Sequence, residues 1–412
     1  MSITLLPVRL RLVSVPKQSL PLLTHPIIRN IFFTNGAARY HSSARPRFFN
    51  ITENQLEVTI VLDMDSASKD FAPLLPFCPG MIICESVFTA LQVDDVYGME
   101  YSGQRIHDLS AALADAGISI LYISTYQTDF ILVKEKRIPL VIATLEQAHF
   151  LVSHPDPPFE RSLLPPLIIP TATATPSSGT SHGPIDISPR DCHPDKWHDR
   201  LLRSDGLASS WGSMSSSPML PMMRGDSEDG GPFLGMEDEA TGLVSNDGER
   251  VAIWEVRKNV RKSVPDNDLR LVGLNRDYID VWSISLVQAL FYPETAQYAD
   301  ESPPPQLDPV QSLSSSRFIS FTQFEDGVSL ICDAALLRGF PEYAVNTFVK
   351  PVVIRCIQMD LTQYGLDKYG VVYSVSDPLV AQGINLLYLS TYRTANVLVR
   401  AHFISDATNG PG

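Results

Sequence analysis

Residues 117–134 read GISILYISTYQTDFILVK, and residues 383–400 read GINLLYLSTYRTANVLVR. The two stretches align without a gap at an offset of 266 (383 − 117), and both carry a Ser-Thr-Tyr centre between two apolar runs. Apolar runs on either side of a short polar centre predict two neighbouring strands joined by a tight turn. Because the period is far too long for a solenoid, the repeat predicts the duplication of a whole module.

The hydrophobic pattern outside the repeat gives both copies similar neighbours. Apolar runs and alternation predict further strands at residues 10–15, 48–52, 57–63, 88–93, 269–273, 318–322, 328–333 and 352–359. Helical spacing predicts helices at residues 22–33, 103–116, 139–147, 278–291 and 371–382. The order β-α-β-β therefore occurs four times, which is the element order of a ferredoxin-like α+β fold.

Composition excludes several functional classes. The chain has 46 acidic and 32 basic residues and a net charge of −14, so it offers no general surface for nucleic acids or anionic membranes. No apolar run reaches about 18 residues, and we therefore predict no membrane span. The five cysteines show no CxxC spacing, which favours reduced thiols in a cytoplasmic protein over a disulfide framework.

The first 52 residues have a composition that imitates a mitochondrial transit peptide. They contain seven basic residues, and the first acidic residue is Glu53. However, residues 10–15 alternate like a strand and residues 22–33 have helical spacing. We therefore predict folded structure here rather than a targeting segment.

Residues 151–248 are rich in Pro and Ser and contain an acidic stretch, which predicts a long disordered linker. Ser188 and Ser217 each precede a proline, so phosphorylation is one interpretation, although such pairs are common in linkers. Cys192, His193 and His198 lie in this segment without a fourth ligand at zinc spacing. We predict no metal site.

The sequence lacks the motifs of common enzymes. It contains no Walker sequence, no phosphate-cradling glycine motif, no nucleophile elbow and no HExxH, and its histidines are scattered. We predict a non-enzymatic protein without a cofactor. A loop with two glycines at residues 365–370 precedes a predicted helix, and exposed N–H groups at such a helix start can hold a carboxylate. A simple turn explains the same loop equally well.

Several stretches of the chain resemble a known family. The segment LYISTYQTDFILVKEKRIPLVIATL at residues 121–145 is similar to the signature of the CASTOR family of cytosolic arginine sensors. Residues 9–33, 318–333 and 370–399 also resemble parts of that family. The resemblance implies four ACT domains in two tandem pairs. Their expected bounds are residues 1–75, 76–150, 249–345 and 346–412, with the linker at 151–248.

The resemblance also implies where the protein binds its ligand and its partner. A small amino acid would bind between the second and fourth domains, and loss of the ligand would expose a surface for a GATOR-like regulatory complex. The positions that match the family's ligand site are Ser119, Ile120, Gly365, Asp367, Lys368, Tyr369, Gly370, Thr391, Tyr392, Thr394 and Ala395. The positions that match its partner surface are Tyr126, Gln127 and Asp129.

Two departures from the family bear on the ligand. The family's arginine site has a Glu in the glycine loop and an Asp after the Ser-Thr-aromatic motif, where this chain has Lys368 and Ala395. A guanidinium group buried without a carboxylate is strongly destabilised, which speaks against arginine as the ligand. We therefore expect an amino-acid sensor of the target-of-rapamycin pathway with a different ligand, and possible homodimers. The alternatives are a regulatory ACT subunit of a biosynthetic enzyme, or an interaction scaffold without a ligand.

Overall fold

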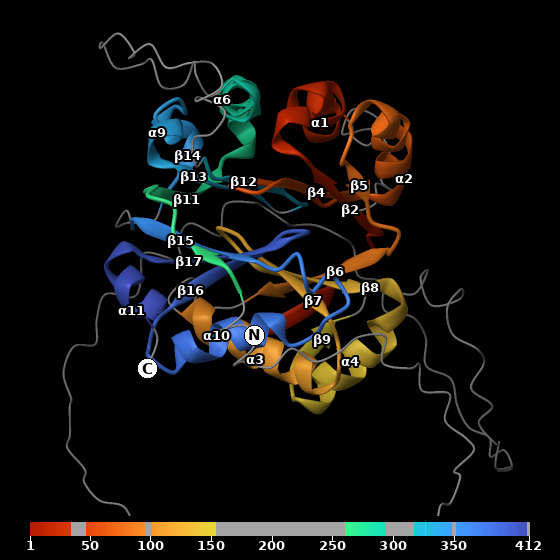
Figure 1. Cartoon of the computed structure of the whole chain (residues 1–412), viewed down its shortest axis with the longest axis vertical. Helices are drawn as coiled ribbons and strands as arrows, with labels where there is room; N and C mark the ends of the chain where they lie inside the picture. The colour runs from red at the N-terminus through yellow and green to blue at the C-terminus, as the bar shows by residue number, and fades with distance from the viewer. Residues whose placement is uncertain are drawn as a thin grey trace, which may run out of the picture. The chain divides into compact units, whose positions relative to one another are not determined.

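The computed structural model describes residues 1–33, 47–94, 101–153, 260–292, 317–325, 327–347 and 352–409 (Figure 1). All of them belong to one compact unit, which comprises Met1–Leu164 and Val244–Gly412. Residues 154–248 of the predicted linker, with Ser188, Ser217 and the Cys192, His193 and His198 group, lie outside the described residues.

The described chain contains four β-α-β-β series, which we call modules 1 to 4. Module 1 consists of β2 (Leu10–Val15), η1 (Lys17–Leu23), α1 (Thr24–Ile28), η2 (Arg29–Phe33), β3 (Phe49–Glu53), β4 (Val58–Asp63), α2 (Met64–Ser66), η4 (Ala67–Phe71), η5 (Ala72–Phe77) and β5 (Ile82–Ile83). Module 3 consists of β11 (Leu269–Leu274), η10 (Arg276–Tyr278), α6 (Ile279–Phe291), β12 (Ile319–Gln323), β13 (Val328–Asp333), α9 (Ala334–Leu337), η12 (Glu342–Ala344) and β14 (Val345–Asn346).

Modules 2 and 4 contain the two copies of the duplicated stretch. Module 2 consists of β1 (Ser2–Leu5), β6 (Phe88–Asp94), α3 (Ser102–Asp115), β7 (Ile120–Ser124), β8 (Asp129–Lys134), η7 (Glu135–Arg137), α4 (Ile138–Gln147) and β9 (Leu151–Ser153). Module 4 consists of β10 (Lys262–Ser263), β15 (Ile354–Asp360), α10 (Val371–Val380), β16 (Leu386–Ser390), β17 (Thr394–Arg400), η13 (Ala401–Phe403) and α11 (Ile404–Asn409).

Local sequence explains the two helices that matter for the site. In α3, Ile106, Leu109 and Leu113 recur on one face and are all fully buried. Gly117 follows this helix with φ +67°, a left-handed conformation that ends helices and suits glycine. Gly383 follows α10 in the same left-handed conformation, with φ +72°, and ends that helix. The duplicated glycines therefore set both helices at the same distance from the strands that follow.

Two large sheets carry the modules in pairs. Modules 1 and 3 share one sheet, in the order β5-β2-β4-β3-β12-β13-β11-β14, joined where Ile51 lies opposite Phe321. Modules 2 and 4 share the other, in the order β9-β1-β6-β8-β7-β16-β17-β15-β10. Short pairings of Leu10 in β2 with Phe88 in β6, and of Leu269 in β11 with Ile354 in β15, connect the two sheets.

The buried apolar residues form three clusters that follow this layering. One cluster lies between the module 1 and 3 sheet and its helices, and a second lies between the module 2 and 4 sheet and its helices. The third combines residues of all four modules on the facing sides of the two sheets. Helices α3 and α10 contact each other beneath β7 and β16, so modules 2 and 4 share one core (Figure 1).

Most predicted elements are confirmed to within a few residues, but the short strands were missed. The strand predicted at residues 10–15 is β2, and the folded structure predicted for the first 33 residues is confirmed. The helix predicted at 22–33 begins earlier, at Lys17, as a 3-10 turn. Strands of two to four residues, such as β1, β5, β9, β10 and β14, carry too little periodicity to be recognised.

The short strands are exchanged between neighbouring modules. Strand β1 comes before module 1 but pairs with β6 and β9 of module 2, while β5 pairs back to β2 of module 1. In the second half, β10 pairs with β15 of module 4 and β14 pairs with β11 of module 3. The predicted domain bounds at residues 75 and 345 do not account for this exchange.

Candidate functional site

The predicted ligand residues converge on a cavity between modules 2 and 4. Its walls are the start of β7 and, from module 4, the loop after β15, the first turn of α10 and the β16–β17 turn. The predicted residues in the lining are Ser119, Ile120, Gly365, Lys368, Thr391, Tyr392 and Thr394. The remainder of the lining is Leu121, Leu361, Tyr364, Leu366, Val371, Val372, Tyr388, Ser390 and Arg393.

The module 4 loop is shaped by its two glycines. Gly365 is exposed, has φ +63° and has no atom near the position where a side chain would begin. Gly370 caps the start of α10 with φ +81°, and its carbonyl accepts from the Ser374 N–H at 2.8 Å. Both conformations favour glycine, so the sequence fixes the path of this loop.

Contacts with module 2 close the loop over the cavity. The Ser119 hydroxyl donates to the Leu366 carbonyl at 2.7 Å, and Lys134 forms an ion pair with Asp367. The cavity has a volume of only about 30 Å³, room for about two water molecules. An amino acid does not fit unless the loop moves.

Thr391 and Thr394 are engaged in the turn that joins β16 to β17. Their hydroxyls lie 2.6 Å apart, and the Thr391 N–H donates to the Thr394 carbonyl at 2.9 Å. The Thr391 hydroxyl also donates to Glu57 of module 1 at 2.8 Å, and Asn54 donates to the Thr394 hydroxyl at 2.8 Å. These contacts hold the wall of the cavity in place.

Four predicted ligand residues do not line the cavity. Asp367 is exposed and turned towards Lys134, and Gly370 is the buried helix cap. Tyr369 is half-buried beside it, outside the lining. Ala395 is fully buried in the core that modules 2 and 4 share. The prediction for these four is corrected because position along a loop or strand does not tell which way a residue faces.

Tyr388, which sequence analysis did not single out, also lies in the wall of this cavity. Tyr388 is only 1% exposed, and burial raises the pKa of its hydroxyl above the ordinary value. It borders the cavity, and no described residue forms a hydrogen bond with the hydroxyl. Sequence reasoning missed it because a Tyr in an apolar run is typical of a core strand.

The predicted partner residues lie at and below the β7–β8 turn. Gln127 is exposed and Tyr126 is half-buried, with its N–H donating to the Ser329 hydroxyl of module 3 at 2.9 Å. The Tyr126 ring lies against Gly273. Asp129 is only 1% exposed and therefore cannot contact a partner directly, which corrects the prediction for that residue.

Asp129 instead belongs to a buried ion pair in module 2. Its carboxylate accepts from Arg105 Nε at 2.7 Å and from the Tyr122 hydroxyl at 3.0 Å. Burial alone would lower the pKa of the Arg105 guanidinium, but the charges of Asp129 and Tyr122 and the hydrogen bonds with both together outweigh burial and raise it. Burial also raises the pKa of the Tyr122 hydroxyl. The group therefore fixes α3 onto the β7–β8 hairpin.

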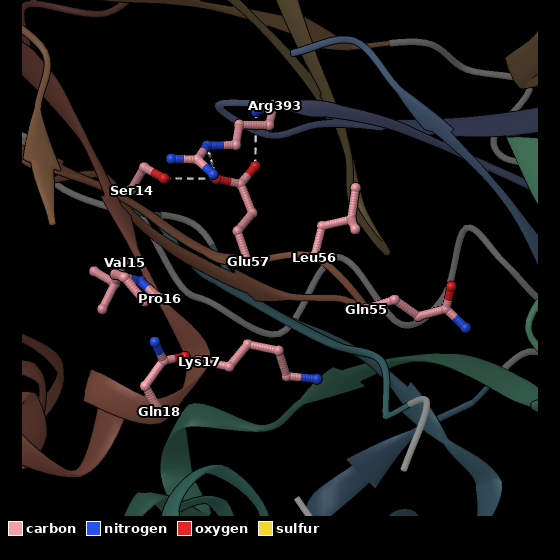
Figure 2. A pocket seen from close by; sticks show the side chains of 9 residues that line it. All are labelled: Ser14, Val15, Pro16, Lys17, Gln18, Gln55, Leu56, Glu57 and Arg393. Carbon is pink, nitrogen blue, oxygen red and sulfur yellow. Dashed lines mark hydrogen bonds and ion pairs between the residues drawn. The ribbon is translucent and has the colours of Figure 1, made fainter. Parts of the chain in front are cut away.

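A larger cavity of about 430 Å³ lies where module 1 meets the β16–β17 turn (Figure 2). Its wall includes Glu57, whose carboxylate accepts from the Ser14 hydroxyl and the Arg393 N–H, both at 2.7 Å. Lys17, also in the lining, pairs with Glu53 at 3.3 Å. Sequence analysis missed Glu57 because nothing in a hairpin turn distinguishes a buried carboxylate from a solvated one.

Other kinds of site find no support within the described ranges. No group of three or more His, Cys, Asp or Glu residues is placed there to hold a metal ion. No helix among the described residues is long and apolar enough to cross a bilayer. Cys78, Cys84, Cys332 and Cys356 are free thiols, as predicted for these four positions.

Comparison with known proteins defines the class. Residues 84–147 and 351–409, which cover most of modules 2 and 4, both match the model of the ACT domain. The chain therefore has a tandem ACT fold. Over 97% of its length it is similar to the human "Cytosolic arginine sensor for mTORC1 subunit 1", at 23% identity over 405 residues and 94% of that protein. The predicted resemblance to the CASTOR family is thus confirmed.

Two further matches cover a smaller share of the protein that is matched. The human "Putative protein CASTOR3P" is 34% identical over 110 residues, which cover 25% of this chain and 64% of that protein. The solved aspartate kinase from Synechocystis aligns with 99% of this chain and 54% of its own, at 10% identity and a TM-score of 0.29. The nearly full-length curated relatives are named as sensors rather than as enzymes, in agreement with the predicted non-enzymatic role.

Proposed function

We propose that the protein is a non-enzymatic amino-acid sensor of four ACT domains, with its ligand between modules 2 and 4. The observation that carries this proposal is the convergence of Ser119 and Ile120 with residues 365–394 around one cavity. A relative named as a cytosolic arginine sensor supports a small amino acid as the ligand and the cytoplasm as the location.

Ligand binding must move the loop at residues 361–370. The Ser119–Leu366 and Lys134–Asp367 contacts hold the loop in the arrangement that leaves a cavity of about 30 Å³. A ligand shifts such an equilibrium only by its difference in affinity for the two arrangements. Both contacts are lost when the loop opens, and contacts with the ligand replace them.

Strand β7 connects the ligand cavity to the proposed partner surface. Its start lines the cavity, and the β7–β8 turn at its other end carries Tyr126 and Gln127. The Tyr122 N–H donates to Ser390 at 2.9 Å and the Tyr388 N–H donates to Ser124 at 3.1 Å, so β7 is fixed to β16 in module 4. We infer that a GATOR-like complex of the pathway named in the relatives binds this turn.

Thermal-shift measurement of the full chain with each of the twenty amino acids tests the ligand. At least one should raise the melting temperature, because a ligand that binds only the folded state stabilises it. Ile120→Trp fills the cavity and should abolish the shift, while Ile284→Trp on the exposed face of α6 should retain it. If no amino acid raises the melting temperature, the ligand site is refuted.

A constitutive scaffold is the second candidate, and the small size of the cavity favours it. Affinity capture separates the candidates, with Tyr126→Ala and Gln127→Ala as variants. Amino-acid-dependent capture of a nutrient-signalling complex, lost in both variants, supports the sensor. Capture of the same complex with and without amino acids supports the scaffold. Capture of a biosynthetic enzyme supports a regulatory subunit.

A further inference from the structure

The internal repeat allows the cavity in module 4 to be compared with the equivalent place in module 2. At the offset of 266, Arg105 corresponds to Val371, Tyr122 to Tyr388, and Asp129 to Ala395. The buried positions of the two helices agree with this alignment, since Ile106, Leu109 and Leu113 correspond to Val372, Val375 and Leu379, which are also buried. The two sites can therefore be compared residue by residue.

In module 2, the chain itself fills the site. The Arg105 guanidinium lies on Asp129, with Nη2 at 2.5 Å and Nε at 2.7 Å from one carboxylate oxygen, and the Tyr122 hydroxyl binds the same oxygen. Every member of the group is at least nine-tenths buried. Module 2 thus shows how this fold holds a guanidinium group, with a carboxylate and a tyrosine hydroxyl together.

The entrance to the module 2 site is also sealed. The Ser102 hydroxyl donates to the Leu386 carbonyl at 2.7 Å, and the Gly103 N–H donates to the Asn385 side chain at 2.7 Å. A Cβ atom on Gly103 would come within 3.1 Å of Asn385 and 3.2 Å of the Leu386 backbone, so a larger residue would push these neighbours apart by a few tenths of an ångström. Module 2 has no room for a ligand here.

In module 4, the same site has lost both charges. Val371 and Ala395 replace the arginine and the aspartate, but the tyrosine remains. Its hydroxyl borders the cavity without a hydrogen-bond partner among the described residues, although Tyr388 is 1% exposed. A tyrosine hydroxyl can donate and accept, so it can form a hydrogen bond with a polar group placed in the cavity.

The charges around the cavity exclude a cationic side chain. The charged groups in its lining are Lys368 and Arg393, and the lining contains no carboxylate. The Glu57 carboxylate lies behind the lining, where it accepts from Thr391 and pairs with Arg393 at 4.0 Å, so its hydrogen-bonding capacity is already used. Asp367 is paired with Lys134 outside the lining, and Ala395 supplies no charge behind Tyr388. A guanidinium or ammonium group placed there would lose its hydration with no anion to replace it.

We propose that the module 4 site takes an amino acid with an uncharged side chain, which packs on Val371 and Val372 beside the Tyr388 hydroxyl. Arginine and lysine are excluded because the counterpart of Asp129 is absent. This proposal rests on the proposed function and adds the ligand class. Module 2, with its own arginine in place, acts as a permanently filled copy of the site.

Isothermal titration of the full chain with leucine, methionine, glutamine, arginine and lysine tests the ligand class. At least one uncharged amino acid should bind, with at least tenfold higher affinity than either cation, and Ile120→Trp should abolish binding. If arginine or lysine binds best and Ile120→Trp abolishes that binding, the ligand class is wrong while the sensor function stands. If no amino acid binds, the proposed function itself fails.

Ala395→Asp tests the comparison between the modules. It places a carboxylate beside Tyr388, so arginine binding should appear or tighten at least tenfold, while Ala395→Asn, of similar shape but uncharged, should not bind arginine. If Ala395→Asp fails to fold, Val371→Arg combined with Ala395→Asp rebuilds the internal pair. That double variant should fold and lose all amino-acid binding. Unchanged binding in the double variant would refute the equivalence of the sites.

Discussion

At the scale of single residues, a position in the repeat does not determine what its side chain does. Asp129 and Ala395 occupy equivalent places in β8 and β17, and both are buried. Asp129 is part of an ion pair that joins a helix to a hairpin, whereas Ala395 leaves the tyrosine opposite without a partner. The loss of one ion pair separates the internally filled site of module 2 from the place in module 4 where we propose that a ligand binds.

Arg105→Met should strongly destabilise the protein. The substitution leaves the Asp129 carboxylate buried without its cation, which costs about 3–5 kcal/mol. Urea denaturation measures the free energy of unfolding. His107→Ala is the matched control on the same helix, because the His107 pairs with Asp108 and Asp377 are more exposed and should contribute about 1 kcal/mol or less. A loss for Arg105→Met no larger than that of the control would contradict the role of the buried pair.

At the scale of elements, the hairpin turns connect the modules across the two sheets. The β7–β8 turn docks on module 3 through Tyr126, Gly273 and Ser329, and the β16–β17 turn docks on module 1 through Tyr392 and Thr59. The Tyr392 N–H donates to the Thr59 hydroxyl at 3.0 Å. Each copy of the Ser-Thr-Tyr motif thus uses its tyrosine as an anchor on a neighbouring module.

Gly273→Ala should loosen the β7–β8 turn. The added Cβ atom would lie 2.8 Å from the Tyr126 ring, so the ring must shift, at a cost of about 1–3 kcal/mol. Hydrogen exchange at residues 125–128 should become faster than in the wild type. Gly339→Ala meets only an ordinary contact at 3.4 Å and is the matched control. Equal exchange rates in the two variants would show that Tyr126 does not anchor the turn.

The fold was largely predictable from the sequence, and the site only in part. Alternation and helical spacing located the long elements because each buries one face over several residues. The exchanged strands β5, β10 and β14 were not predicted because each is only two residues long. The site prediction named loops that meet at one cavity, but it did not give the orientation of Ala395 or Asp129, because orientation depends on which module covers the strand. Nothing in the sequence indicated that the Glu57 carboxylate is buried.

At the scale of the whole molecule, the fold encloses several groups that must stay protonated. Tyr122, Tyr388, Cys332 and Cys356 are at most 2% exposed. Burial raises the pKa of each above the ordinary values of 10.0 for tyrosine and 9.0 for cysteine. In the unfolded chain these groups ionise at their ordinary values. At high pH the unfolded chain releases protons that the folded chain retains, and this difference shifts the equilibrium towards the unfolded state.

The protein should consequently lose stability in alkaline solution. A raised pKa in the folded state contributes stability that is complete below the unfolded value and is lost as the pH rises through about 9 to 10 and beyond. Urea midpoints between about pH 7.5 and pH 10.5, measured under reducing conditions, should fall steadily. Tyr388→Phe removes one of these groups and should make the decline shallower. A midpoint that is independent of pH would show that these groups are accessible in the folded state.

The placement of β1 has a practical consequence for dissecting the molecule. Because Ser2–Leu5 forms the strand between β6 and β9, the extreme amino terminus completes the sheet of module 2 rather than that of the module it precedes. A fragment that begins after module 1 would expose a hydrogen-bonding edge along β6 and the apolar surface that Ile3 and Leu5 cover. A recombinant piece meant to carry module 2 therefore needs these first residues, supplied in the same polypeptide or as a synthetic peptide.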